Sequence, residues 1–203
     1  MQIQLTDAGK RFNRDWIFRH VSYVFESGNS YAITGPNGSG KSTLLQVIAG
    51  ATQQSEGTVQ YSRDNQKLEP EHFHRELTIA APYLELIEEM TATEFLAFHA
   101  SFKPLSLPVN EIIGILGMEK AADKQIRYYS SGMKQRIKLA QAIFSDTPVV
   151  LLDEPCTNLD LPGYQLYHRL IENYCSHKLI IVSSNDANEM DFCKEKISIM
   201  DFK

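Results

Sequence analysis

The 203-residue chain has few cysteines and no long apolar run. Its three cysteines, Cys156, Cys175 and Cys193, form neither a Cys-x-x-Cys pair nor an even-numbered disulfide framework, so we expect buried thiols in a reducing compartment. No apolar stretch approaches the ~18 residues that a helix needs to span a bilayer. The first residues lack the basic and apolar regions of a secretory leader, which favours a cytoplasmic location.

Basic residues are also in deficit, because 20 Lys and Arg stand against 25 Asp and Glu, for a formal net charge of −5. Nucleic-acid-binding proteins usually carry a basic excess, so we expect no nucleic-acid partner. The content of 43% hydrophobic and 22% charged residues is typical of a folded globular protein and argues against disorder. The length predicts one domain, over residues 1–203.

Two kinds of apolar pattern predict two kinds of strand. Residues 2–6, 20–26 and 57–61 alternate between apolar and polar side chains, as half-buried antiparallel strands do. Residues 149–152 and 179–182 are apolar throughout, which is typical of strands buried on both faces of a parallel sheet. The helical pattern that lies between these last two segments completes a βαβ unit.

The middle third of the chain has helical patterns, and we place a helical subdomain at about residues 84–147. Asn110 is expected to cap a short helix that ends before Gly117. Ser130 and Ser131 open a longer helix. The order of these elements predicts an α/β domain with an antiparallel piece first and a helical insertion in the middle.

A capping box marks the first helix of this middle third. Thr91 and Glu94 have the spacing at which each side chain bonds the other residue's backbone N–H. Phe95, Phe98 and Phe102 follow at helical intervals. We interpret these aromatic side chains as core packing rather than as a cofactor site.

One glycine-rich segment follows a predicted strand at 31–34 and precedes a predicted helix at 41–49. Residues 35–42 match the pattern G-x-x-x-x-G-K-[ST] in the strand–loop–helix context that this motif requires. The glycines let backbone N–H groups surround phosphate oxygens, and the positive end of the helix dipole lies beneath them. Lys41 is expected to face the β- and γ-phosphates, and the Ser42 hydroxyl to bind Mg²⁺. The candidate nucleotide-binding residues are Gly35, Pro36, Asn37, Gly38, Ser39, Gly40, Lys41, Ser42 and Thr43.

Two adjacent carboxylates, Asp153 and Glu154, follow the apolar strand 149–152. Ligands collect at the carboxyl ends of parallel strands, so both acids should face the phosphates. We expect Asp153 to hold Mg²⁺ and Glu154 to activate the attacking water. An acidic turn without function would be the better interpretation if the phosphate loop were missing.

With these residues, the segment Tyr129–Arg136 and the tripeptide Asn158-Leu-Asp160 complete a set in which the chain resembles the ATP-binding subunits of ABC transporters. The resemblance covers nearly the whole chain, with the motifs in the family's order. It implies a P-loop NTPase fold with a mostly parallel core sheet, an N-terminal antiparallel β subdomain and a helical subdomain. It also implies ATP and Mg²⁺ as the bound groups.

The resemblance further implies a head-to-tail dimer in which ATP lies between one subunit's phosphate loop and the other subunit's signature segment. Here Tyr129–Gln135 stands where the family carries Leu-Ser-Gly-Gly-Gln, with Ser131-Gly132 retained. A helix N-terminus with free N–H groups and a hydroxyl is suited to bind a γ-phosphate. The residues expected to act on the partner's nucleotide are Ser130, Ser131, Gly132, Met133, Lys134 and Gln135.

Two more positions take roles from the resemblance. Asp160 resembles the aspartate that couples the two nucleotide sites. Phe12 stands where an aromatic side chain usually stacks on adenine; Trp16 is an alternative for that role, and a buried core position is an alternative for Phe12.

The chain departs from the family at two places. Tyr83 stands where the family usually has a glutamine, and Asn185 where it usually has a histidine near the γ-phosphate. Asparagine can donate a hydrogen bond, but it has no titratable proton and no cationic form. We therefore expect ATP binding with slow hydrolysis, and Lys41, Glu154 and Asn185 as the catalytic residues.

The sequence thus predicts a cytoplasmic ATPase subunit that dimerises on ATP, with a second copy or a homologous subunit, and drives an integral membrane permease. Its short length and its Ser-Ser-Gly-Met-Lys-Gln-Arg segment resemble export-type subunits, including the haem-exporter type. Two alternatives stay open. One is a non-transport ATPase of the same family, and the other is a dimerisation switch that holds ATP with little turnover.

Overall fold

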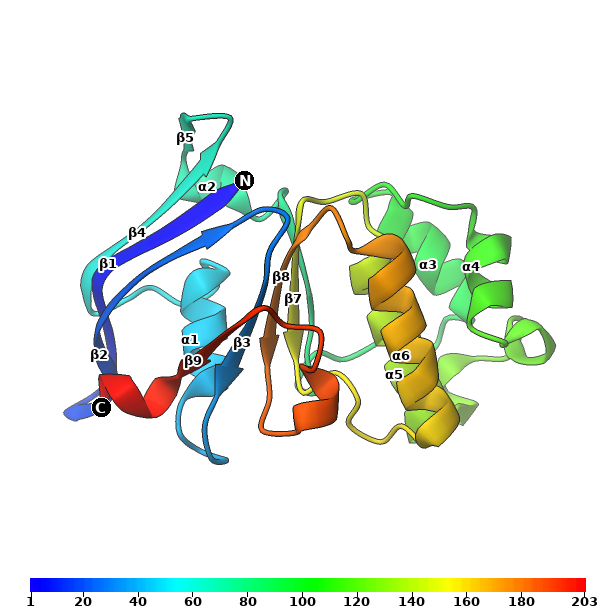
Figure 1. The fold of residues 1–203 in the computed structure, drawn as a ribbon. Helices are drawn as coiled ribbons and strands as arrows, with labels where there is room; N and C mark the ends of the chain where they lie inside the picture. The colour runs from blue at the N-terminus through cyan, green and yellow to red at the C-terminus, as the bar shows by residue number, and fades with distance from the viewer.

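The computed structural model describes residues 1–203 and contains two β-sheets (Figure 1). Four antiparallel strands in the order β2-β1-β4-β5 form one sheet, and five parallel strands in the order β6-β7-β8-β3-β9 form the other. This confirms the predicted fold class, in which a parallel core sheet is combined with an antiparallel N-terminal part. No helix combines the length and hydrophobicity that crossing a membrane requires.

The antiparallel sheet extends beyond the strands predicted for it. Its members are β1 (Gln2–Phe12), β2 (Asp15–Glu26), β4 (Glu56–Arg63) and β5 (Gln66–Leu68). The pairing of β1 with β2 shifts register between Leu5 and Ala8, where Asp7 has a positive φ of 49°. Such a bulge ends the alternation of apolar and polar side chains although the strand continues, so the sequence pattern covers only its first half.

The parallel sheet holds the strands that were predicted to be buried on both faces. Its members are β6 (Leu77–Ala80), β7 (Val149–Asp153), β8 (Leu179–Ser183), β3 (Ser30–Thr34) and β9 (Glu195–Ser198). Along β7, Val150 and Leu152 pack into one hydrophobic core, and Val149 and Leu151 pack into another on the opposite face. This prediction is confirmed, because alternate side chains of a fully covered strand meet different cores.

Helices cover both faces of the parallel sheet (Figure 1). On the side of the antiparallel sheet lies α1 (Lys41–Ile48), and on the other side lie α5 (Ser131–Ile143) and α6 (Leu161–Tyr174). The remaining helices are α2 (Pro70–Phe73), α3 (Ala92–Ala100) and α4 (Val109–Ile115), with 3₁₀ turns η1 (Glu119–Ala121), η2 (Ile126–Tyr128), η3 (Ala187–Glu189) and η4 (Ile199–Phe202).

The start of α3 confirms the predicted capping box, but the aromatic residues after it are only partly in the core. The Glu94 N–H donates to Thr91 Oγ1 at 3.2 Å, and the Thr91 N–H donates to the Glu94 carboxylate at 2.8 Å. Phe95 is buried, whereas Phe98 is 44% exposed and Phe102 is 72% exposed. The core assignment of these two was wrong, because α3 buries a narrow face and ends at Ala100, before Phe102.

The helix after the proline-rich connector begins earlier than predicted. Pro108, with φ −59° and ψ 143°, is the N-cap of α4, and Asn110 is the second residue inside the helix. Asn110 is therefore not the cap. The fixed φ of proline suits the entry to a helix, and its missing N–H costs nothing there.

Candidate functional site

The strands β3, β7 and β8 all end at the lower edge of the parallel sheet in Figure 1. The phosphate loop, defined here as residues 35–42, leaves β3 at this edge and enters α1. Asp153 and Glu154 leave β7 there, and Asn185 follows β8. The topology thus brings the predicted catalytic groups to one edge.

The backbone of the phosphate loop requires glycine at its last position before the helix. Gly40 has a φ of 100°, a left-handed conformation that other residues rarely adopt. A Cβ atom added there would also lie 2.3 Å from Cγ2 of Ile17. Gly40 is the N-cap of α1 and offers no side-chain cap, so the first N–H groups of the helix stay free to bind an anion.

Lys41 is the central charge of this loop. The residue is only 4% exposed, and Nζ donates to the carbonyl oxygens of Gly35 at 2.9 Å and Pro36 at 3.3 Å. The ammonium group is thereby held inside the loop, where backbone N–H groups and the helix dipole already favour anions. This arrangement suits the binding of phosphate.

A cavity of about 230 Å³ opens above the loop and unites its residues with one of the acids. Glu154 contributes to the same cavity as Lys41, although 113 positions of sequence separate them. The remaining lining residues are Ile17, Asn37, Gly38, Gly40, Ser42 and Thr43. The cavity therefore combines phosphate-binding groups with a carboxylate that can accept a proton.

Asp153 is the test of whether the site fits a metal ion. The residue is only 2% exposed, and its Oδ1 atom is buried without a hydrogen-bond partner. A buried carboxylate oxygen without a donor is costly, and Mg²⁺ takes oxygen ligands such as carboxylates. The chemistry of Asp153 and of the Ser42 hydroxyl in the adjoining loop fits Mg²⁺ bound with a nucleotide.

Glu154 is held in a strained backbone conformation. Its φ is 44°, and its N–H donates to the carbonyl oxygen of Ser183 on β8 at 2.8 Å. A non-glycine residue in this region costs about 1–3 kcal/mol and persists only where the surroundings impose it, often at functional sites. The hydrogen bond to β8 helps to hold this conformation, and Glu154 lines the phosphate cavity.

Asn185 contacts the phosphate loop directly. Its Nδ2 donates to Oδ1 of Asn37 at 3.2 Å. Asn185 and Glu154 also line one further cavity of about 250 Å³. The structure thus brings Asn185 to the phosphate loop, and its catalytic role stays a prediction.

Tyr83 follows β6, which lies on the opposite side of β7 from β8, and the residue is 47% exposed. Partial burial raises the pKa of its hydroxyl and the Asp153 carboxylate adds to this rise, while a hydrogen bond with the Gln46 side chain of α1 opposes it. Sequence reasoning placed Tyr83 here but found no signal for Gln46.

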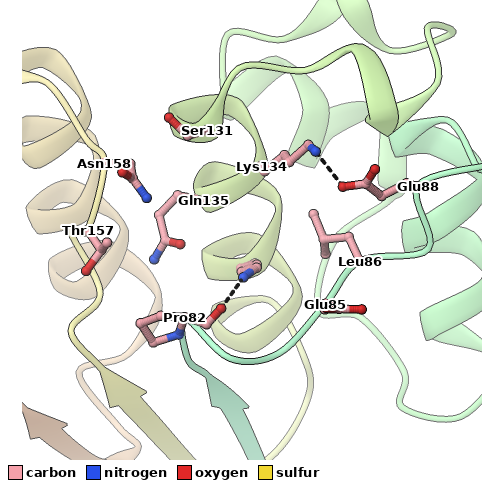
Figure 2. A pocket seen from close by; sticks show the side chains of 10 residues that line it. Pro82, Glu85, Leu86, Glu88, Ser131, Lys134, Gln135, Thr157 and Asn158 are labelled. Carbon is pink, nitrogen blue, oxygen red and sulfur yellow. Dashed lines mark hydrogen bonds and ion pairs between the residues drawn. The ribbon is translucent and has the colours of Figure 1, made fainter.

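The signature segment lies in a separate place from the phosphate loop of its own chain. Ser130 is the N-cap of α5 and accepts from the Met133 N–H at 3.3 Å. Ser131 and Lys134 line a cavity of about 460 Å³ that contains no phosphate-loop residue (Figure 2). Within one chain these two groups of predicted residues are not brought together.

Gln135 differs from the rest of the signature segment. It is 4% exposed, and its Nε2 donates to the carbonyl oxygen of Pro155 at 2.6 Å. This bond connects α5 to the residues that follow Glu154. Gln135 already has this contact inside its own chain, whereas Ser130 and Ser131 are exposed.

Neither Asp160 nor Phe12 lines the phosphate cavity. Asp160 caps α6 by accepting from the Gly163 N–H at 2.9 Å, and its carboxylate lies 3.7 Å from Arg136. Phe12 is 48% exposed, with the Lys10 ammonium 4.9 Å from its ring centre, so the core alternative for Phe12 was wrong. Ile17, rather than Phe12, lines the phosphate cavity, and the adenine role of Phe12 stays a prediction.

Trp16, the alternative partner for adenine, lies beside two guanidinium groups. Arg19 is 4.3 Å and Arg11 is 5.4 Å from its ring centre. Such cation–π contacts already use the aromatic face.

Glu189 is a buried acid that sequence reasoning missed. It is 4% exposed, its Oε1 accepts from the Cys156 N–H at 2.7 Å, and its Oε2 is buried without a partner. Burial raises its pKa, and the charges of Asp186 and Glu154 act in the same direction against hydrogen bonds with Ser184 and Cys156. Glu189 therefore connects η3 to the segment that carries Glu154.

Comparison with known proteins agrees with these motifs. The family described as ABC transporter matches residues 18–157. An uncharacterized ABC transporter ATP-binding protein of Bacillus subtilis is 30% identical over 94% of this chain and 65% of its own length. A sulfate/thiosulfate import ATP-binding protein of Mesostigma viride is 30% identical over 96% of this chain and 58% of its own length.

Another curated relative is a cytochrome c biogenesis ATP-binding export protein of Pasteurella multocida. It is 29% identical over 92% of this chain and 89% of its own length. The chain thus spans less than two thirds of the first two relatives and most of the third, and the names include both import and export proteins.

Solved structures share the fold at low sequence identity. The ATP-binding subunit of an ABC transporter aligns with a TM-score of 0.84 at 24% identity, covering 98% of this chain and 85% of that one. A dimeric ATP-binding cassette in a post-hydrolysis state with ADP and Pi aligns with a TM-score of 0.79 at 24% identity, covering 97% and 93%.

Proposed function

The chain belongs to the ABC transporter family, and on this basis we propose that it binds ATP with Mg²⁺ and hydrolyses it as the ATP-binding subunit of a transporter. The observation that carries the proposal is the buried Asp153 Oδ1 atom, which has no partner beside a cavity that holds Lys41 and Glu154. A divalent cation and a triphosphate are the groups that such a set of charges attracts.

In this proposal, the residues in and beside the cavity have separate roles in hydrolysis. The Lys41 ammonium and the N–H groups at the start of α1 bind phosphate oxygens and oppose their negative charge. The Glu154 carboxylate accepts the proton of the attacking water. Asp153 and Ser42 hold Mg²⁺, which supplies charge neutralisation at the phosphates when bound. Asn185 can donate one hydrogen bond at the phosphate loop but cannot transfer a proton.

Dimerisation completes the site in this proposal. Ser130, Ser131 and the free N–H groups of α5 form a second phosphate-binding terminus, yet they lie outside the phosphate cavity of their own chain. A second copy, or a homologous subunit, can present them to the bound nucleotide. The dimeric cassette among the similar folds supports this arrangement.

The membrane partner and the direction of transport are finer parts of the proposal. An integral membrane permease would hold the subunit at the cytoplasmic face. We favour export, because the Ser-Ser-Gly-Met-Lys-Gln-Arg segment resembles that of export-type subunits. We also expect slow turnover in the isolated subunit, because Tyr83 and Asn185 replace a glutamine and a histidine.

The substitution Glu154→Gln tests the proposal. The amide keeps the shape of the side chain but cannot accept a proton, so ATP binds and hydrolysis stops. We expect the rate to fall by about 10²–10⁴-fold, the usual effect of losing a general base. Gel filtration with Mg-ATP should then show a lasting dimer, while the exposed control Glu172→Gln keeps wild-type turnover.

Two results of this experiment would contradict the proposal. A Glu154→Gln variant that binds ATP yet stays monomeric at high protein concentration would falsify the homodimer. A variant that hydrolyses ATP at the wild-type rate would remove Glu154 from the reaction.

A dimerisation switch is the second candidate function, and Asn185 favours it. Its amide contacts the phosphate loop through Asn37 and offers no proton to the reaction. A steady-state ATPase assay with and without membranes distinguishes the candidates. A transporter subunit turns over ATP and responds to its permease, whereas a switch binds ATP and dimerises without sustained phosphate release.

A further inference from the structure

The turn η4 lies beside the phosphate loop because the strands that lead into them are neighbours (Figure 1). β9 pairs with β3 in parallel, and Ser198 stands opposite Thr34 in the register. The phosphate loop begins one residue after Thr34, and η4 begins one residue after Ser198. Parallel strands end at the same edge of a sheet, so η4 and the loop leave that edge as neighbours.

Ile199, the first residue of η4, packs against the first residue of the loop. Ile199 is fully buried, and a Cβ atom added to Gly35 would lie 2.6 Å from its Cγ2 atom. Ile199 also shares a hydrophobic core with Leu44 and Leu45 of α1, the helix that follows the loop. An apolar residue of η4 therefore contacts the start of the loop from the core.

Lys203, which follows η4, contacts the loop near its other end. Its Nζ donates to the carbonyl oxygens of Ser39 at 2.6 Å and of Ile17 at 2.7 Å. Ile17 belongs to β2 and lines the phosphate cavity, and a Cβ atom at Gly40 would meet its side chain. Hydrogen bonds from a charged donor are stronger than those between neutral groups. One ammonium group thus joins the phosphate loop to β2.

The lysine contacts of the loop use its carbonyl oxygens and leave N–H groups to the ligand. A loop that binds an anion through N–H groups has carbonyl oxygens that must find donors elsewhere. Lys41 is the donor for the first two residues of the loop, and Lys203 is the donor for Ser39. The Gly40 N–H belongs to the same peptide unit as the Ser39 carbonyl, and no group of the chain accepts from it. A donor at the carbonyl oxygen polarises this peptide, which makes its N–H a better donor to an anion.

We propose that Lys203 is a positioning residue of the nucleotide site, which holds the phosphate loop against β2 in the conformation that binds phosphate. The inference rests on the proposed function, because it takes a nucleotide as the ligand of the loop. A loop that is already held loses less conformational freedom when the ligand binds. Lys203 does not line the phosphate cavity, so its effect should fall on binding and not on the hydrolysis step.

The substitution Lys203→Met tests this role, because methionine keeps most of the apolar stem but cannot donate. We expect the Kd for Mg-ADP, measured by isothermal titration calorimetry, to rise about tenfold, which corresponds to about 1.4 kcal/mol. KM for ATP should rise by a similar factor, while kcat at saturating ATP stays within about twofold of the wild type. Lys203→Arg keeps a charged donor and should restore most of the affinity.

Lys194→Met is the matched control. Lys194 Nζ also donates to two oxygen atoms of a loop, the Gly28 carbonyl at 2.9 Å and Asn29 Oδ1 at 3.3 Å. That loop precedes β3, at the opposite end of the strand from the phosphate loop, so this variant should keep the wild-type Kd and KM. Hydrogen exchange of the amides in residues 37–41, measured without nucleotide, should become faster in Lys203→Met and stay at the wild-type rate in Lys194→Met.

The proposal and the proposed function fail in different ways. Wild-type protein that binds neither Mg-ATP nor Mg-ADP contradicts the proposed function, and hydrogen exchange still tests the hold on the phosphate loop. Unchanged exchange of residues 37–41 in Lys203→Met overturns the positioning role. So does a wild-type Kd in Lys203→Met, a loss of affinity that Lys203→Arg leaves in place, or a fall in kcat with KM unchanged.

Discussion

Two loops flank the end of β7, the strand that leads into Glu154, and different side chains attach them to the rest of the fold. The loop after β6 carries Tyr83, and Nζ of Lys138 donates to the carbonyl oxygens of Ala81 and Pro82 in this loop. The loop after β8 leads to Glu189. The buried carboxyl group of Glu189 accepts a hydrogen bond from the backbone N–H of Cys156, two residues after Glu154. One loop is attached by a lysine of α5 and the other by a buried carboxyl group of η3.

Despite this difference, the two attachments share one feature. Both attachments use main-chain atoms on one side, so neither depends on the side chain that occupies the functional position. We therefore expect substitutions of Tyr83 or Asn185 to leave both attachments intact. The loops differ in what they contact, because Asn185 bonds the phosphate loop while the Tyr83 segment bonds the signature helix region.

The largest effect should come from Lys41→Met, which removes the charge of the phosphate loop. Wild-type protein at a ligand concentration of about 100 Kd gains about 2.7 kcal/mol of stability from the bound nucleotide. We expect the variant to gain almost none, measured as the shift in Tm on adding Mg-ATP. The bonds of Nζ to Gly35 and Pro36 are also lost, so each variant is compared with its own nucleotide-free Tm.

Lys120→Met is the matched control, since it removes an exposed lysine that lies outside the cavity. It should be stabilised by Mg-ATP as much as the wild type. Equal stabilisation of Lys41→Met would show that the nucleotide binds elsewhere and that neither flanking loop faces it.

The phosphate loop, the capping box and the buried strands could be predicted from the sequence, because their interactions are local. The phosphate loop is one contiguous segment, and the capping box joins Thr91 and Glu94 across three positions. The apolar runs of β7 and β8 follow from burial on both faces. In each case a short pattern carries the physical cause.

No short pattern in the sequence predicts the hydrogen bonds that attach the two flanking loops. Lys138 meets Pro82 across 56 positions, and Glu189 meets Cys156 across 33. Both bonds go to backbone atoms, so the partner residue type carries no signal. The exposure of Phe102 was missed for a related reason, because a helical spacing does not show where the helix ends.

A smaller effect, of opposite sign, is expected for Asn185→His on the β8 side. The imidazole can hydrogen-bond both a phosphate oxygen and the attacking water. It can also transfer a proton, which an amide cannot. One such contact is worth ~1–4 kcal/mol in the transition state, by analogy with oxyanion-hole donors, so kcat should rise at least several-fold. KM for ATP should change little, because Lys41 and the helix N-terminus are untouched.

Asn173→His controls for the change of residue type at an exposed position of α6. An unchanged kcat in Asn185→His would indicate that the loop with Tyr83, and not Asn185, limits the rate of hydrolysis. A lower kcat with intact ATP binding would show that the Asn185–Asn37 contact already serves the reaction, and that asparagine is the functional residue here.

The smallest effect concerns the pH dependence of stability through Glu189. Its pKa is raised in the folded protein, mainly by burial, so the folded state holds this proton more tightly than the unfolded chain does. The stability it contributes is complete below the ordinary pKa of glutamate and is lost as pH rises through the raised pKa. Glu189→Gln keeps an oxygen for the Cys156 N–H but never ionises, so it should not lose that stability.

The free energy of unfolding in urea, measured between about pH 4 and pH 8, tests this sign. Relative to the wild type, Glu189→Gln should become steadily more stable as pH rises, while the exposed control Glu172→Gln shows no trend. A constant loss of stability at every pH would instead mean that the amide fails to replace the hydrogen bond. In that case the ionisation of Glu189 would not govern the stability of the β8 loop, because the loss would be independent of pH.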